Sequence, residues 1–138
     1  AVHLGMAVAL DDGLVVPVVE DADKMTLITL AKTLQDRISK ARDGTLSGEH
    51  YTGSTFTITN IGKTGVEYFT PILNTPEVGI LGVGTLMSEL ALEDGQVVQK
   101  QKLPLSLTFD HQVIDGAPAA DFLARVIFYL EHPYALVL

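Results

Sequence analysis

The sequence predicts a mixed α/β (α+β) domain with a sandwich-like arrangement, because helical and strand patterns alternate along it without any internal repeat. Apolar residues recur at helical spacing in residues 25–41 and 117–130, and shorter β-branched or apolar runs surround these segments. A chain of 138 residues forms one domain at most, and it can bury roughly two-thirds of its unfolded surface. We therefore expect a single domain over residues 1–138.

The composition indicates a large core and burial between subunits. Hydrophobic residues make up 47% of the chain and charged residues 19%, and the mean hydropathy is +0.30. A lone small domain rarely needs so much apolar sequence. We therefore expect other copies of the chain to cover part of it.

Charge and residue content exclude several partners. The net charge is −8, and no run of Lys or Arg could follow a nucleic-acid backbone. No stretch approaches the roughly 18 apolar residues of a membrane span, and residues 1–10 lack the pattern of a signal peptide. The absence of cysteine excludes disulfides, thiolate metal sites and a cysteine nucleophile, and it fits a reducing cytosol or matrix.

The first segment predicts a β-hairpin. Residues 1–10 and 14–20 are apolar runs around Asp11-Asp12-Gly13, and Asp-Gly is a strong hairpin signal. Pro17 has no N–H for a strand ladder, so we expect the second strand to be irregular or at an edge there.

An amphipathic helix is predicted over residues 25–41. Asp23 or Thr26 suits its N-cap, and Gly44 suits its C-terminal stop. The Lys and Arg residues between its apolar positions should form a solvated face.

The middle of the chain predicts further strands. One continuous apolar run has the length of a buried strand, and Asp94-Gly95 marks a second hairpin. We expect strands at 55–59 (ending at Asn60), 78–83, 86–92 and 97–101, and loops at 44–53, 60–65 and 71–76.

His111 is the leading candidate for a chemical role, because it lies where a strand gives way to a helix. Residues 103–109 alternate in the strand period before it, and the helix at 117–130 follows. Asp115 suits the N-cap, where it would fix the turn, and Gly116 would let the backbone pass close to its neighbours. A strand-end histidine is more often structural than catalytic, so the pattern alone leaves both roles open.

Other short motifs are better explained as structure. Gly-Lys-Thr at 62–64 lacks the first glycine of a P-loop, since Thr57 stands there. The glycines at 79–84 do not follow the dinucleotide-binding order or open a helix. Three further histidines are too scattered for a metal site: His3, His50 and His132.

Three stretches together resemble one family. They are Thr-Ile-Thr-Asn-Ile-Gly at 57–62, Phe-Thr-Pro-Ile-Leu-Asn-Thr-Pro-Glu-Val-Gly-Ile-Leu-Gly-Val-Gly at 69–84, and Phe-Asp-His-Gln-Val-Ile-Asp-Gly-Ala at 109–117. The combination resembles the catalytic domain of dihydrolipoyl acyltransferases, the cores of 2-oxo acid dehydrogenase complexes, with the pyruvate type favoured. The resemblance implies a chloramphenicol-acetyltransferase-like, CoA-dependent acyltransferase sandwich.

The chain departs from this family in several ways. Gln112 stands where the family usually has Arg, and Thr59 where many pyruvate-type members have Ser. The family's catalytic domain begins well upstream of residue 1. We therefore expect residues 1–138 to be its C-terminal portion, with the N-terminal part missing and with neither a lipoyl nor a peripheral-subunit-binding domain.

By resemblance, the reaction moves an acyl group, most simply acetyl, between dihydrolipoamide and coenzyme A. The implied general base is His111, the Thr59 hydroxyl would stabilise the oxyanion, and Asp115 would hold the loop. Asn60 and Gly116 would lie near the bound coenzyme A or lipoamide. Coenzyme A is then a substrate, the lipoyl group comes from a separate domain, and no metal is expected.

The resemblance also implies partners. The histidine of one subunit would meet the threonine of its neighbour in a homotrimer, and trimers would form a 24-mer or 60-mer core. Lipoyl domains, the dehydrogenase and dihydrolipoamide dehydrogenase would be further partners, the last two through absent segments. The apolar tail at 134–138 would dock between trimers or pack on its own subunit.

The expected location is the bacterial cytoplasm, or the mitochondrial matrix in a eukaryote. Two alternatives stay open. One is a non-catalytic assembly fragment, and the other is a different His-x-x-x-Asp-Gly acyltransferase that acts on an antibiotic or a peptidyl carrier.

Overall fold

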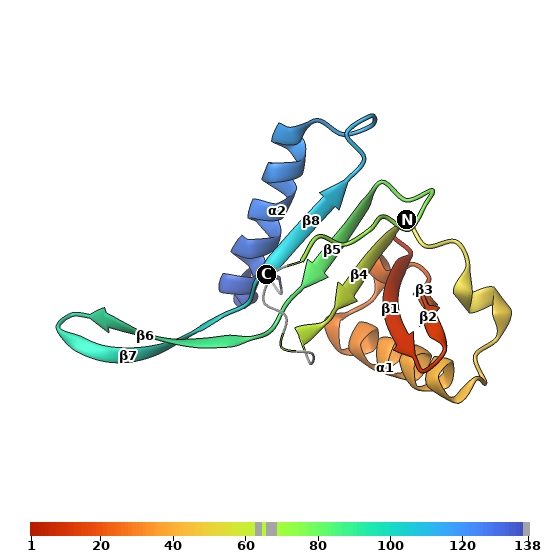
Figure 1. Ribbon diagram of the computed structural model, residues 1–138, viewed down its shortest axis with the longest axis horizontal. Coiled ribbons are helices and arrows are strands. Elements are labelled where there is room, and N and C mark those ends of the chain that lie inside the picture. The colour runs from red at the N-terminus through yellow and green to blue at the C-terminus, as the bar shows by residue number, and fades with distance from the viewer. Residues whose placement is uncertain (63–64, 66–68, 137–138) are drawn as a thin grey trace.

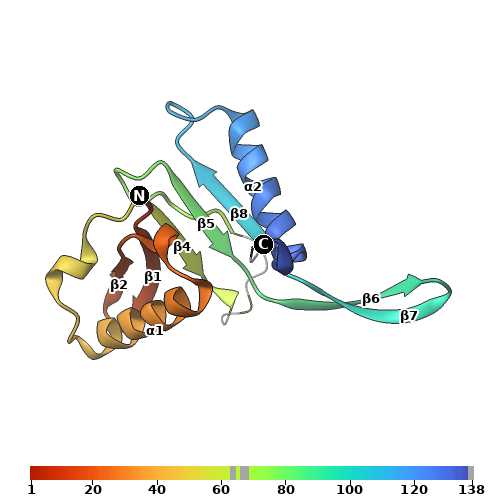
Figure 2. The same ribbon diagram turned by 180° about the vertical axis from the view of Figure 1, so that it is seen from behind.

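The fold is a single twisted sheet with a helix packed at each side and a long hairpin arm projecting from it (Figures 1 and 2). This computed structural model describes residues 1–62, 65 and 69–136. The main sheet has six strands in the order β2-β1-β4-β5-β8, and β3 also pairs with β1. The helix α1 packs on β1 and β3, and α2 packs on β8. This arrangement confirms the predicted mixed α/β class.

The predicted N-terminal hairpin is present, but its second strand is divided. β1 (Leu4–Leu10) pairs antiparallel with β2 (Gly13–Val15), and Leu10 faces Gly13 across the turn. Pro17 interrupts the ladder, and β3 (Val18–Val19) then pairs with the start of β1. The predicted single strand at 14–20 is therefore wrong, whereas the irregularity at Pro17 is confirmed.

The first long helix, α1 (Leu27–Asp43), begins and ends as its capping residues dictate. The Thr26 hydroxyl accepts a hydrogen bond from the Thr29 N–H at 3.2 Å, and Gly44 adopts φ 74° at the C-terminal stop. Short 3₁₀ turns flank the helix: η1 (Ala22–Lys24) and η2 (Gly48–Tyr51). Of the two predicted caps, Thr26 is confirmed and Asp23 is not.

Arg37 corrects the prediction that all basic residues of this helix face solvent. Its side chain is only 18% exposed. The guanidinium donates from Nε to the Val18 carbonyl at 3.2 Å and from Nη2 to Glu20 at 3.3 Å. Arg37 therefore ties α1 to the sheet edge rather than belonging to a solvated face.

The centre of the sheet is built from β4 (Phe56–Asn60), β5 (Gly79–Val83) and β8 (Leu105–Phe109). β1, β4 and β5 run parallel, and β8 runs antiparallel to β5. Ile80 and Leu81 of β5 are buried, as the continuous apolar run predicts. The central strands thus give the core a rigid frame.

The second predicted hairpin forms an arm that leaves the main sheet (Figure 1). Among the residues that the structure describes, its strands, β6 (Met87–Glu93) and β7 (Gln96–Lys102), pair with each other and with no other strand. Asp94 at φ 51° and Gly95 at φ 77° form the tight turn. Leu90, Leu92 and Val97 are exposed on one face, and the pairs Glu89–Lys102 and Glu93–Lys100 lie on the other.

The second long helix, α2 (Gly116–Glu131), lies along β8 and is followed by the 3₁₀ turn η4 (Pro133–Leu136). Much of its apolar surface is uncovered, including Phe128 and Leu130. The chain exposes 9472 Å², whereas a compact monomer of its mass exposes about 7,000 Å². The excess of about 2,500 Å² is of the size that oligomer interfaces bury. Within the described residues, neither helix has the length and apolarity that crossing a membrane requires.

Candidate functional site

The His111 turn is held by its neighbour Asp110. The Asp110 carbonyl accepts from the N–H groups of Val113 and Ile114 at 3.0 and 2.9 Å, and its carboxylate accepts from the Gln112 N–H at 2.9 Å. The His111 ring is exposed, and its centroid lies 5.7 Å from that of Phe109. The imidazole is therefore open to solvent.

Asp115 occupies the predicted N-cap position of α2 without making the predicted capping bond. Its backbone is extended, at φ −76° and ψ 160°, but its side chain accepts no hydrogen bond from the first turn. The work of fixing the turn falls instead to Asp110. Gly116 has open space where a Cβ would lie, so within one chain no close approach explains this glycine.

Thr59 lies near the end of β4, where it lines a cavity of about 430 Å³. Apolar side chains from β1 and β5 and from residues 69–74 supply most of the other walls. Asn60 follows at the strand end, and its Oδ1 accepts from the Gly62 N–H at 2.8 Å. The Asn60 side chain thus closes the turn after β4. The Gly-Lys-Thr segment lies mostly outside the described residues, as does the end of the apolar tail at 137–138.

Within one chain, the sheet register places Thr59 and His111 at opposite ends of the central strands. Thr59 is level with Gly82 of β5, which is level with Ser106 of β8. Phe109 lies three residues beyond Ser106 along β8, a distance of about 10 Å. β8 lies two strands from β4, which adds about 10 Å across the sheet. His111 follows Phe109, so more than about 14 Å separates the two positions. One chain cannot bring both side chains to the same reacting atom.

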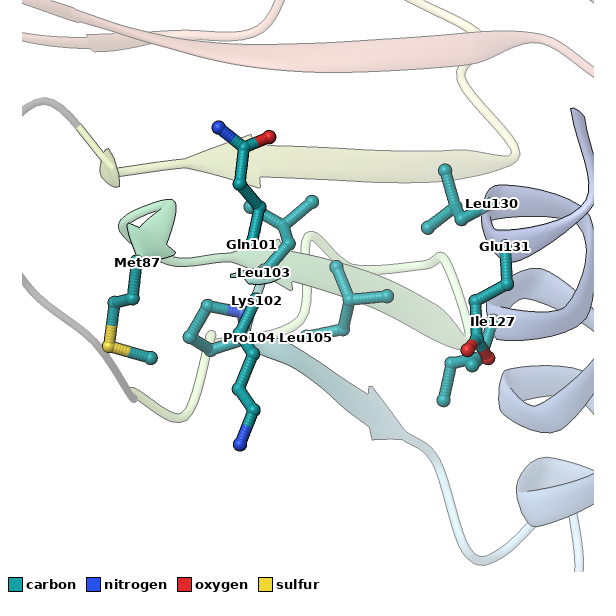
Figure 3. Close-up of a pocket in the computed structure, with 9 residues that line it drawn as sticks. All are labelled: Met87, Gln101, Lys102, Leu103, Pro104, Leu105, Ile127, Leu130 and Glu131. Atoms are coloured by element: carbon teal, nitrogen blue, oxygen red, sulfur yellow. The ribbon is translucent and has the colours of Figure 1, made fainter. Parts of the chain in front are cut away.

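Two further cavities lie near α2. The larger, about 530 Å³, lies at the base of the arm (Figure 3). In this view Met87 and residues 101–105 lie opposite Ile127, Leu130 and Glu131 of α2. It includes none of the predicted site residues. The smaller, about 230 Å³, lies between the sheet and α2 and is lined by Phe109 and Ile114, which flank the His111 turn.

The remaining histidines each contact their own surroundings. His3 Nδ1 accepts from the Asp21 N–H at 3.0 Å, and His132 Nδ1 lies 2.9 Å from the Phe128 carbonyl. His50 Nδ1 lies 2.8 Å from the Glu20 carboxylate. Burial raises the pKa of Glu20, but hydrogen bonds with His50 and Arg37 outweigh it and hold the pKa below its usual value. In the described part of the chain, no group of three or more His, Cys, Asp or Glu residues could hold a metal ion.

Sequence reasoning missed one buried polar residue, Glu77. Only 7% of this residue is exposed, and its carboxylate accepts hydrogen bonds from Ser54, Thr57 and Asn74. The available signal was an acidic residue directly before a continuous apolar strand, a place where a charge needs specific partners.

Comparison with known proteins gives a consistent picture. A protein from Bacillus subtilis, the dihydrolipoyllysine-residue acetyltransferase component of its acetoin cleaving system, is 55% identical over 99% of this chain and 34% of its own length. The corresponding component of the pyruvate dehydrogenase complex from Mycoplasma capricolum is 41% identical over 98% of this chain and 31% of its length. The chain therefore spans about a third of the curated relatives that it matches.

Solved structures show the same fold. The cubic core of a pyruvate dehydrogenase multienzyme complex superposes with a TM-score of 0.90 at 41% identity, covering 99% of this chain and 56% of that chain. Dihydrolipoamide acetyltransferase from Azotobacter vinelandii also gives 0.90, at 40% identity and with the same coverage. These neighbours confirm the predicted acyltransferase-core fold. The family model for the 2-oxoacid dehydrogenases acyltransferase catalytic domain matches residues 1–138, and the chain belongs to that family.

Proposed function

We propose that this chain transfers an acetyl group between dihydrolipoamide and coenzyme A, as part of the catalytic domain of a larger acyltransferase. Membership of the acyltransferase family and relatives that are acetyltransferases support this reaction. The spacing of Thr59, His111 and Asp115 carries the proposal for the site.

In the Azotobacter acetyltransferase, a serine, a histidine and an asparagine were investigated for their role in catalysis, and the serine lies 52 residues before the histidine and the asparagine four after it. In this chain Thr59 precedes His111 by the same 52 residues, and Asp115 follows it by four. Threonine retains the hydroxyl of serine, and aspartate retains one side-chain oxygen of asparagine. The spacing supports Thr59 and His111 as the reacting pair, with Asp115 in the third position.

The chemistry of thiol exchange explains these residue types. A free thiol of pKa about 8.5 is only a few per cent thiolate at neutral pH, so a base that removes its proton during attack accelerates the reaction. His111 is exposed to an incoming thiol and takes that role. Attack on the thioester creates an oxyanion, to which the Thr59 hydroxyl donates a hydrogen bond. The acyl group passes directly between the two sulfur atoms, so no cysteine on the protein is needed.

The separation of the two residues in one chain supports an oligomer. Because they lie more than about 14 Å apart along and across the sheet, a complete site needs His111 from one copy and Thr59 from another. A homotrimer supplies three such sites around its axis. The surface excess and the unpaired arm favour contact between copies, and the cubic core of a structural neighbour favours a 24-mer over a 60-mer.

The wider partners follow from this role. Lipoyl domains would deliver the acetyl group, and the dehydrogenase and dihydrolipoamide dehydrogenase components would bind the full-length protein through its other segments. A bacterial cytoplasm is the proposed location, in keeping with the bacterial relatives. The 55% identity to an acetoin-system component, against 41% to a pyruvate-system one, favours acetoin cleavage as a second candidate for the source of the acetyl group.

The experiment uses the full-length protein, with acetyl-CoA and dihydrolipoamide as substrates. We expect His111→Ala to lower turnover about 10²–10⁴-fold and Thr59→Ala about 10²–10³-fold, while native mass shows unchanged assembly. His132→Ala, which removes an imidazole at the far end of α2, serves as the matched control and should retain activity. Full activity of the His111 variant would overturn the proposed mechanism. Assembly without any turnover by the wild type would favour the scaffold alternative.

A further inference from the structure

Glu77 joins two segments of the chain, residues 54–57 and the loop at 69–76, through one buried carboxylate. Its Oε1 accepts from the Thr57 hydroxyl at 2.8 Å, while Oε2 accepts from the Ser54 hydroxyl at 2.8 Å and from the Asn74 amide at 2.7 Å. Ser54 precedes β4, Thr57 lies within it, and Asn74 belongs to the loop at 69–76. A buried carboxylate is tolerated only when such donors satisfy it, so the three bonds hold these segments in fixed relative positions.

The neighbouring strand leaves room for this cluster. Gly5 of β1 lies directly opposite Thr57 in the sheet register. A Cβ at Gly5 would lie 3.0 Å from the Thr57 hydroxyl, 2.8 Å from Val16 and 3.3 Å from Ser54. The close approach of the cluster to β1 therefore requires glycine there.

The loop at 69–76 forms one wall of the cavity beside Thr59, and it is fixed at both ends. At one end the Phe69 ring packs on Gly82, where a Cβ would lie 2.7 Å from the ring. At the other end Asn74 donates to Glu77, and the Asn74 carbonyl accepts from the Glu77 N–H at 3.0 Å. Thr57 and Thr59 project from the same face of β4 and both line this cavity. The carboxylate thus links the loop wall to the strand that carries the oxyanion donor.

We propose that Glu77 is a positioning residue that sets the distance between the 69–76 loop and β4, and so limits the size of the acyl group accepted beside Thr59. The inference rests on the proposed function. If Thr59 donates to the oxyanion, the acyl chain attached to that carbon lies within van der Waals reach of the Thr59 cavity. Pro71 and Leu73 from the loop line the same cavity, and their placement decides how large an acyl chain fits.

The test compares acyl donors in the full-length protein. Glu77→Gln keeps the side-chain size but replaces one accepting oxygen with an N–H₂ group, so at least one of the three donors loses its acceptor. We expect the ratio of kcat/KM for acetyl-CoA to that for isobutyryl-CoA to fall about 5-fold or more, since one methylene in an apolar pocket is typically worth about 10–200-fold. A loss of folded protein lowers both values equally and leaves the ratio unchanged. Glu49→Gln, at a side chain that is 76% exposed, is the matched control.

Asn74→Ala provides a second variant, because it releases the loop while leaving Ser54 and Thr57 on the carboxylate. Hydrogen exchange supplies a readout that does not depend on activity. The Glu77 amide, which donates to the Asn74 carbonyl, should lose protection in both variants, while the amides of β5 keep theirs. Unchanged protection of the Glu77 amide, or an unchanged acyl ratio with active protein, would overturn the positioning role. An inactive wild type with the predicted exchange pattern would instead overturn the proposed function, and the acyl-size limit with it.

Discussion

Mixing two inactive variants tests the separation of His111 and Thr59 directly. His111→Ala and Thr59→Ala are produced together in equal amounts in the full-length protein, each with its own affinity tag. Alone, each variant should retain about 1% of turnover or less, because each lacks the general base or the oxyanion donor.

The sheet register fixes the size of the recovery. β8 runs opposite to β4 through their shared neighbour β5, so under the proposed mechanism each complete site would take His111 from one copy and Thr59 from another. In a random equal mixture, half of the copies supply an intact His111 and half supply an intact Thr59. About one quarter of the sites are then complete, and turnover should reach about one quarter of the wild-type value.

The assay measures acetyl transfer from acetyl-CoA to dihydrolipoamide, on assemblies purified through both tags in turn. Wild type carrying both tags gives the reference turnover, and the two variants purified separately and then combined without exchange give the background. Mixed assemblies that are no more active than this background would refute the shared site, and with it the distance argument from the register.

Two further predictions concern stability. Gly82→Ala should lower the unfolding free energy by about 1–3 kcal/mol, because the added Cβ would lie 2.7 Å from the Phe69 ring. Gly48→Ala, whose Cβ would meet open space, is the control and should leave the unfolding free energy unchanged. Equal denaturation midpoints for the two variants would contradict this. Burial raises the pKa of Glu20, but hydrogen bonds with His50 and Arg37 hold this pKa below its ordinary value of 4.5. The ionised carboxylate therefore stabilises the folded protein above pH 4.5. This contribution is lost as the pH falls through the lower pKa of the folded state. Glu20→Gln should therefore unfold more easily at neutral pH and lose less stability on acidification, as urea titrations across pH would show; parallel curves for both proteins would disprove it.

Local signals in the sequence predicted most of the secondary structure. Asp-Gly pairs mark both hairpins, Thr26 and Gly44 bound the first helix, and the apolar run around Ile80 forms a buried strand. These features depend on residues close together in the chain, so periodicity and turn chemistry are enough to find them.

Long-range contacts explain what the sequence did not reveal. Arg37 fits a solvated helix face by its spacing, but Val18 and Glu20 of another segment draw it inward. Glu77 could not be identified as a hub, because its donors lie 23, 20 and 3 residues away. At the histidine turn, the pattern placed Asp115 correctly at the N-cap, while Asp110 makes the stabilising bonds. The resemblance implied that Thr59 and His111 come from different subunits, and the sheet register supplied their separation of more than about 14 Å within one chain.

The reversed direction of β8 has a genetic consequence if sites are shared between copies as proposed. Each subunit then contributes its imidazole to one neighbour and its hydroxyl to the other. A subunit defective in both groups disables two sites of a trimer rather than one. Such an allele would act dominantly in a cell that also expresses the intact gene, and the damage would exceed its share of the protein.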